Sequence, residues 1–174
     1  ASPWPAAPVS VGFDALRRSP HWASPRGHFD PSWLSLTARP GWLGLRGRQS
    51  PFSGYDQSLV ARRIQNFDFS AETRVDFAPP ASFQQMAGLI CLYDTMKFIY
   101  LRMYYSQSLG GPALGILRAE NGKRQELTDY RVAVPAGQTA VHLRVIARDL
   151  ALQFAWSADG KAWQDIGSTF DETT

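Results

Sequence analysis

The sequence predicts an all-β protein built as a two-sheet sandwich or a barrel. Apolar residues recur at every second position in several short runs, which is the period of a strand with one buried face. Turn-forming dipeptides separate these runs, and no segment of ten or more residues shows helical spacing. Many short strands joined by regular turns are typical of antiparallel sandwiches and barrels.

Size and charge describe one ordinary globular domain and exclude several classes of partner. The chain has 174 residues, 44% of them apolar, with 18 Lys and Arg against 15 Asp and Glu. Because cations and anions are interleaved along the chain, we expect no nucleic-acid partner. No stretch reaches the roughly 18–20 uninterrupted apolar residues of a membrane helix, so we expect no membrane partner either. The single cysteine, Cys91, excludes an internal disulfide and lies in an apolar run.

Residues 1–30 are predicted to be a proline-rich linker and an extended lead-in, and residues 31–174 to form the β domain. The first 30 residues are rich in proline and show neither the helical nor the strand period. Because the chain begins with Ala1 and not with Met, we expect it to be a fragment or a processed product of a longer protein.

Three runs in the middle of the chain predict strands of different exposure. Residues 67–77 alternate apolar with charged or polar side chains, which predicts a half-exposed strand. Residues 87–93 are apolar at every position, as expected for a strand covered on both faces. Residues 97–105 place aromatic side chains on one face and mainly aliphatic ones on the other.

Two further runs, 141–148 and 150–157, predict a hairpin that turns at Arg148-Asp149. Asn-Gly and Asp-Gly pairs are the strongest hairpin dipeptides, and they occur here at residues 121–122 and 159–160. We therefore expect antiparallel strands to flank these pairs too.

Catalytic and metal-binding patterns are missing from the sequence. Asp68, Glu72 and Asp76 share one strand face, but a spacing of four residues separates neighbours by roughly 13 Å. Glycosidases need two carboxyl groups roughly 5–9.5 Å apart. The three histidines stand in no nucleophile or zinc-ligand pattern. We predict no catalytic residue, no metal and no cofactor, although two acids from different strands can still meet.

Aromatic residues are the remaining chemical feature, with 10 Phe, 6 Trp and 6 Tyr. Sugars pack on flat aromatic rings, but most of these residues follow the apolar period of a strand and are expected in the core. Tyr55 differs, because it lies in a turn-rich loop over residues 51–57 where no strand period applies. Its ring is predicted to point outward, for recognition or for packing on a neighbour.

Several motifs, taken in this order and spacing, resemble a known family. They are Trp42-Leu-Gly-Leu-Arg-Gly-Arg48, Gln57-Ser-Leu-Val-Ala-Arg-Arg63, Phe67-x-Phe-x-Ala-Glu-Thr-x-Val-x-Phe77, Gln84-Gln-Met-Ala-Gly-Leu89 and Phe154-x-Trp-Ser-x-Asp-Gly-x-x-Trp163. The chain from Phe13 to its C-terminus resembles the C-terminal concanavalin A-like domain of glycoside hydrolase family 43 β-xylosidases and α-L-arabinofuranosidases.

The resemblance implies a two-sheet antiparallel jelly-roll sandwich over residues 31–174, without the last strand or strands of the family. It also implies an accessory, non-catalytic role beside a five-bladed catalytic propeller of the same polypeptide, which would hydrolyse xylo- or arabino-oligosaccharides. Whether the chain is itself an enzyme stays open. It also stays open whether the full-length enzyme forms a homo-oligomer, and whether it is cytoplasmic or secreted.

In the family, one loop of the sandwich reaches toward the propeller's pocket. Its aromatic tip, often Phe, falls at Tyr55 here, so the resemblance implies a pocket wall made by Phe52, Tyr55 and Asp56. Closing the pocket would suit cleavage of short chain ends. Arg62 and Arg63 are interface candidates, but neighbouring strand residues point to opposite faces, so at most one can face the propeller.

Two alternatives remain for the function. An independent carbohydrate-binding module would stack Tyr100, Tyr104 or Trp163 on a sugar chain. A jelly-roll glycosidase in its own right would need two acids from different strands, which the carboxylate spacing does not favour.

Overall fold

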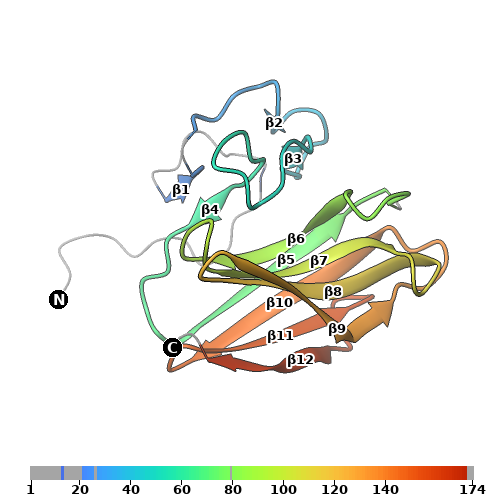
Figure 1. The fold of residues 1–174 in the computed structure, drawn as a ribbon. Helices are drawn as coiled ribbons and strands as arrows, with labels where there is room; N and C mark the ends of the chain where they lie inside the picture. Colours follow the sequence, from blue (N-terminus) through green and yellow to red (C-terminus); the bar gives the residue numbers. More distant parts are fainter. Residues whose placement is uncertain (1–12, 14–20, 26, 79, 172–174) are drawn as a thin grey trace. The chain divides into compact units, whose positions relative to one another are not determined.

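A computed structural model describes residues 13, 21–25, 27–78 and 80–171 (Figure 1). These residues form twelve strands and no α-helix, which confirms the all-β prediction. The described part has no helix that could cross a membrane. The chain divides into two compact units, residues 1–63 and 64–174. Most of the predicted lead-in over 1–30 lies outside the described residues.

The second unit is a sandwich of two four-stranded sheets, in the orders β12-β11-β10-β5 and β6-β7-β8-β9 (Figure 1). All neighbouring strands pair antiparallel, which confirms the two-sheet antiparallel prediction. The strands are β5 (Phe69–Asp76), β6 (Met86–Leu92), β7 (Phe98–Ser106), β8 (Gly111–Glu120), β9 (Lys123–Ala133), β10 (Ala140–Arg148), β11 (Ala151–Ser157) and β12 (Gln164–Asp171).

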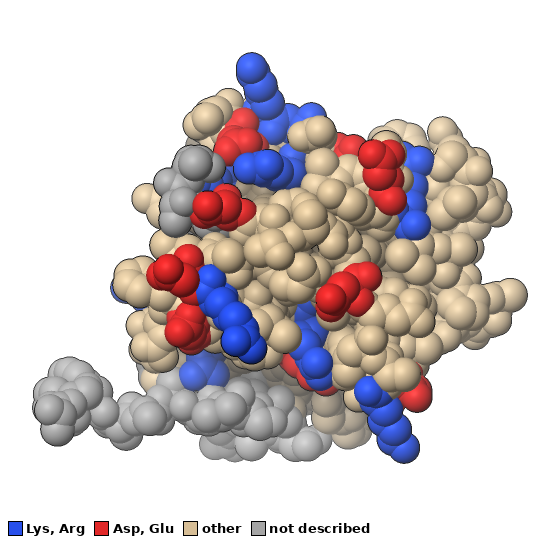
Figure 2. All heavy atoms as spheres, turned by 90° about the horizontal axis from the view of Figure 1, so that it is seen from below, with Lys and Arg blue, Asp and Glu red and all other residues tan. Residues whose placement is uncertain are grey.

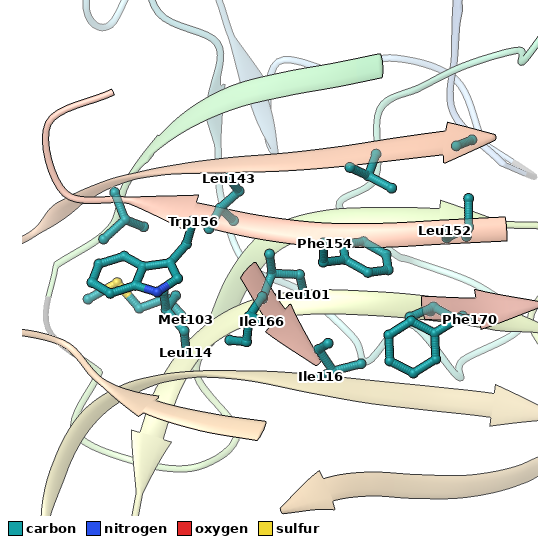
Figure 3. Close-up of a cluster of buried hydrophobic side chains, with 14 of the residues drawn as sticks. Leu101, Met103, Leu114, Ile116, Leu143, Leu152, Phe154, Trp156, Ile166 and Phe170 are labelled. Carbon is teal, nitrogen blue, oxygen red and sulfur yellow. The ribbon is translucent and has the colours of Figure 1, made fainter. Parts of the chain in front are cut away.

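The core lies between the two sheets and is built from alternate residues of the strands. On β10, the side chains of Val141, Leu143 and Val145 are buried, and the residues between them are half-exposed. Phe154 of β11 is fully buried, and its ring lies 6.0 Å from the ring of Phe170 on β12 (Figure 3). The strand period read from the sequence therefore selects the face that each strand buries.

The strand buried on both faces is β7 and not β6. The uniformly apolar run predicted a doubly covered strand over 87–93, but every residue of β6 is only half-buried. In β7, eight of the nine residues are buried. In the sheet, β6 lies at an edge and β7 lies between β6 and β8.

Two predicted hairpins end in two-residue turns. Arg148 pairs with Ala151, so the first turn lies at Asp149 and Leu150, one residue later than the predicted Arg148-Asp149. Asp149 and Leu150 have φ angles of 50° and 67°. Positive φ at both central residues is the mark of a type I′ turn, whose twist matches that of the flanking strands. The Asn-Gly turn at 121–122 between β8 and β9 has the same signature.

The Asp-Gly pair at 159–160 does not form a two-residue hairpin. Trp156 pairs with Gln164, so the connection from β11 to β12 is longer. The Asp159 carboxylate accepts backbone hydrogen bonds from Ala162 (2.9 Å) and Lys161 (2.8 Å). These bonds lower the pKa of Asp159 to about 2. Asp159 therefore organises a wider turn than the sequence predicts.

Leu150→Gly should raise the free energy of unfolding by about 1 kcal/mol, because left-handed backbone costs a residue with a Cβ atom roughly 1–2 kcal/mol. Urea unfolding of the chain measures the change. Leu109 is an exposed leucine in another turn, and its φ angle is not positive. Leu109→Gly is therefore the matched control, and it should not raise the free energy of unfolding. An unchanged or lower unfolding free energy for Leu150→Gly would contradict strain at this turn.

The first unit contains short strands and an ordered loop. β1 (Trp22–Ala23) pairs antiparallel with β4 (Ala61–Arg62), and β2 (Leu34–Ser35) pairs with β3 (Gly44–Leu45). Trp33, just before β2, is buried. The loop that joins β3 to β4 carries the predicted pocket-wall residues.

Candidate functional site

The segment of residues 49–58, called the Tyr55 loop below, closes on itself. The backbone N–H of Gln49 donates to the carbonyl oxygen of Asp56 at 3.2 Å, and Gln49 forms a parallel bridge with Gln57. A surface segment whose ends meet in this way is a compact, self-packed loop of a kind that is frequently functional.

Two polar side chains fix the interior of the Tyr55 loop. The amide of Gln57 is buried and donates to the carbonyl oxygens of Pro51 (2.6 Å) and Ser53 (2.5 Å). The hydroxyl of Ser53 accepts a hydrogen bond from the Tyr55 N–H (3.2 Å) and donates to the Tyr55 carbonyl oxygen (2.7 Å). The backbone of Tyr55 is therefore held at both of its polar groups.

The side chain of Tyr55 points outward, with 73% of its surface exposed. Phe52 is half-buried in the same loop, and Asp56 is exposed. The three predicted pocket-wall residues thus share one ordered loop, and Tyr55 presents the largest apolar surface among them. A recognition role for this exposed ring stays a prediction.

Arg62 and Arg63 differ in exposure. Arg62 lies on β4, pairs with Trp22 across the ladder and is half-buried. Arg63 follows the strand and is exposed. This difference agrees with side chains that alternate across a strand. An interface role for either residue stays a hypothesis.

Tyr100 and Tyr104 of β7 are 7% and 3% exposed. Burial raises the pKa of both phenols. The guanidinium carbon of Arg102 lies 4.0 Å from the centroid of the Tyr104 ring. Sugar stacking needs an accessible ring face, so this burial does not favour the predicted stacking role of the two tyrosines.

Trp163, the third candidate for sugar stacking, is half-buried, and one ring face is occupied. The guanidinium carbon of Arg144 lies 3.5 Å from its ring centroid, and Arg144 also pairs with Glu72 at 3.1 Å. The rings of His142 and Trp163 are nearly perpendicular, with centroids 6.5 Å apart. The packing gives Trp163 a cation–π role within the sandwich.

The carboxylates that the sequence placed on one strand face have structural partners. Glu72 pairs with Arg144, and the Asp68 carboxylate accepts a hydrogen bond from the Asp149 N–H at 2.8 Å. Among the described residues, no three His, Cys, Asp or Glu side chains converge as metal ligands would. Figure 2 shows anionic and cationic side chains scattered over one face of the molecule, without a field of a single sign.

The comparison with family models decides the family. Residues 10–174 match the model described as the beta xylosidase C-terminal concanavalin A-like domain. The chain belongs to this family. Membership confirms the resemblance predicted from the motifs, and with it the concanavalin A-like fold of the two-sheet sandwich.

Among relatives, the chain is 38% identical over 159 residues to a putative beta-xylosidase of Escherichia coli (strain K12), covering 91% of this chain and 30% of that protein. It is 32% identical over 171 residues to a xylan 1,3-beta-xylosidase of Vibrio sp, covering 98% and 31%. The crystal structure of a xylan beta-1,4-xylosidase from Bacillus halodurans C-125 matches with a TM-score of 0.90 and 36% identity, covering 98% of this chain and 32% of that one. The chain spans about a third of the length of these relatives.

Proposed function

We propose that the chain is the accessory, non-catalytic sandwich domain of a longer glycosidase of the β-xylosidase or α-L-arabinofuranosidase type. The parent would hydrolyse O-glycosyl bonds of xylo- or arabino-oligosaccharides in a separate catalytic propeller. The Tyr55 loop would contribute an apolar wall to the pocket of that propeller. The observation that carries the proposal is the exposed ring of Tyr55 on a loop whose backbone is tied from within.

Three findings support a role that depends on a catalytic partner. The relatives named as xylosidases are about three times longer than the chain, which leaves room for a catalytic domain. The acids Asp68 and Glu72 serve the sandwich itself. Of the aromatics predicted for independent sugar binding, Tyr100 and Tyr104 are buried, and Trp163 has a guanidinium group over its ring.

An apolar wall would act by closing the pocket. A ring beside the reacting sugar excludes water and confines the substrate, which favours short oligosaccharides that present a chain end. Tyr55 is suited to this task because the loop fixes its backbone before any substrate arrives, so little ordering remains to be done on binding.

Calorimetric titration of xylo-oligosaccharides tests the proposal at the level of the domain. We expect a flat trace for the chain alone and continuing heat of hydrolysis for the full-length polypeptide. Saturable heat with the chain alone would identify an independent carbohydrate-binding module. Continuing heat with the chain alone would identify a glycosidase in its own right. Either of these two results would overturn the proposal.

A further inference from the structure

We infer that Arg48 is the positioning residue of the Tyr55 loop, and that it acts on substrate binding by holding Tyr55 in place. The inference rests on the proposed function, since it assigns a second residue to the same pocket wall. Arg48 lies one residue before the loop begins, and its side chain reaches the loop's far end.

One guanidinium group contacts three consecutive residues at the end of the loop. The Arg48 Nη2 donates to the carbonyl oxygen of Gln57 at 2.7 Å, and Nε donates to Ser58 Oγ at 3.3 Å. Nη1 lies 3.7 Å from the Asp56 carboxylate. A planar guanidinium with several fixed donors can bridge such groups at once, whereas the point charge of lysine cannot.

The same guanidinium is anchored on the buried part of the first unit. Its carbon lies 4.7 Å from the centroid of the Trp33 ring, which is buried. Ser58 Oγ in turn donates to the carbonyl oxygen of Arg46, and the Arg46 N–H donates to the carbonyl oxygen of Trp33 at 2.8 Å. Arg48 therefore links the loop to the buried Trp33.

The loop needs such a link because its backbone is strained next to Tyr55. Asp56 has a φ angle of 58°, in the left-handed region, which costs a residue with a Cβ atom conformational energy although Asp adopts it more readily than most. Strained backbone persists only when its surroundings hold it. Without Arg48, we expect residue 56 to relax toward extended conformations and to turn the Tyr55 ring away from its present direction.

Steady-state kinetics of the full-length polypeptide test the inference, with 4-nitrophenyl β-D-xylopyranoside and 4-nitrophenyl α-L-arabinofuranoside as probes. Arg48→Ala and Arg48→Lys should both raise KM about five- to tenfold on the cleaved probe and leave kcat within about twofold, because positioning acts on binding. Arg39→Ala is the matched control. Arg39 stacks on Trp42 at 3.9 Å in the same unit but outside the loop, so its KM should not change.

A double variant distinguishes an effect of Arg48 that acts through Tyr55 from a general effect of Arg48 on the structure of the domain. If Arg48 acts through Tyr55, then Arg48→Ala should add little to the KM of Tyr55→Ala, because coupled residues are not additive. A full additional KM rise in the Tyr55→Ala background would overturn the inference. If Arg48→Ala fails to fold, Arg48→Lys, which keeps the charge, carries the same test.

The outcomes also separate this inference from the proposed function. If Tyr55→Ala leaves kinetics unchanged, the pocket wall itself is wrong, and Arg48 loses its role with it. If Tyr55→Ala raises KM but both Arg48 variants match the wild type, only the positioning role is wrong.

Discussion

Tyr55→Ala should lower kcat/KM of the full-length polypeptide for xylobiose, or for the aryl pentoside that it cleaves, by about ten- to a hundredfold. Burying an aromatic ring of this size against a ligand is worth about 1.5–3 kcal/mol, and each 1.4 kcal/mol corresponds to about a factor of ten. Tyr55→Phe should stay within about twofold of the wild type, because it keeps the apolar ring that the wall requires. Steady-state kinetics measure all three proteins.

Tyr93 supplies the matched control for this prediction. It is a tyrosine with 84% exposure in the connection between β6 and β7, so Tyr93→Ala removes a similar ring from outside the Tyr55 loop. Its kinetics should be those of the wild type. Equal losses in the two variants, or no loss in Tyr55→Ala, would contradict the pocket-wall role.

Phe154→Ala should lower the free energy of unfolding of the chain by about 3–5 kcal/mol, the range observed when a buried phenylalanine is truncated. Phe154 is fully buried, and its ring packs against Phe170 at the centre of the sandwich (Figure 3). The loss combines the transfer energy of the ring with the cavity that it leaves. Urea unfolding followed by tryptophan fluorescence measures it.

Phe67→Ala is the control for the core prediction. Phe67 precedes β5 and is exposed, so its truncation should change the unfolding free energy by no more than about 0.5 kcal/mol. If Phe154→Ala costs as little as Phe67→Ala, the two sheets do not enclose the core described above.

The fold could be predicted from the sequence wherever a strand has one buried and one exposed face. β5 and β10 alternate as their sequences predict, and the β10–β11 hairpin turns within one residue of the predicted place. The order of strands in a sheet has no such local signal. The uniformly apolar run therefore did not reveal that β6 is an edge strand, nor that β7, with Arg102 in its middle, is the more deeply buried of the two.

The exposure of Tyr55 could also be predicted, because a large ring in a turn-rich loop has no strand period to obey. The roles of the residues that hold the loop could not be predicted from the sequence. Arg48 and Gln57 act through hydrogen bonds to backbone carbonyl groups, and those bonds exist only after the loop has folded. The one available signal was that both residues belong to the family-like motifs.

The accessibility of the three aromatic candidates for sugar stacking could not be predicted from the sequence. Tyr100 and Tyr104 follow a pattern that fits an exposed sheet face as well as a covered one, and the structure covers them. Trp163 is partly accessible, but Arg144 reaches it from β10, far away in the sequence. Ring accessibility depends on tertiary packing, which a single-strand pattern does not contain.

A crystal structure of the full-length polypeptide with a xylo-oligosaccharide bound in the catalytic pocket tests the central claim most directly. The account predicts that the Tyr55 ring lines that pocket, with ring carbons about 4 Å from the sugar, in van der Waals contact. A Tyr55 ring that faces solvent or another surface, with the pocket closed by other residues, would contradict it.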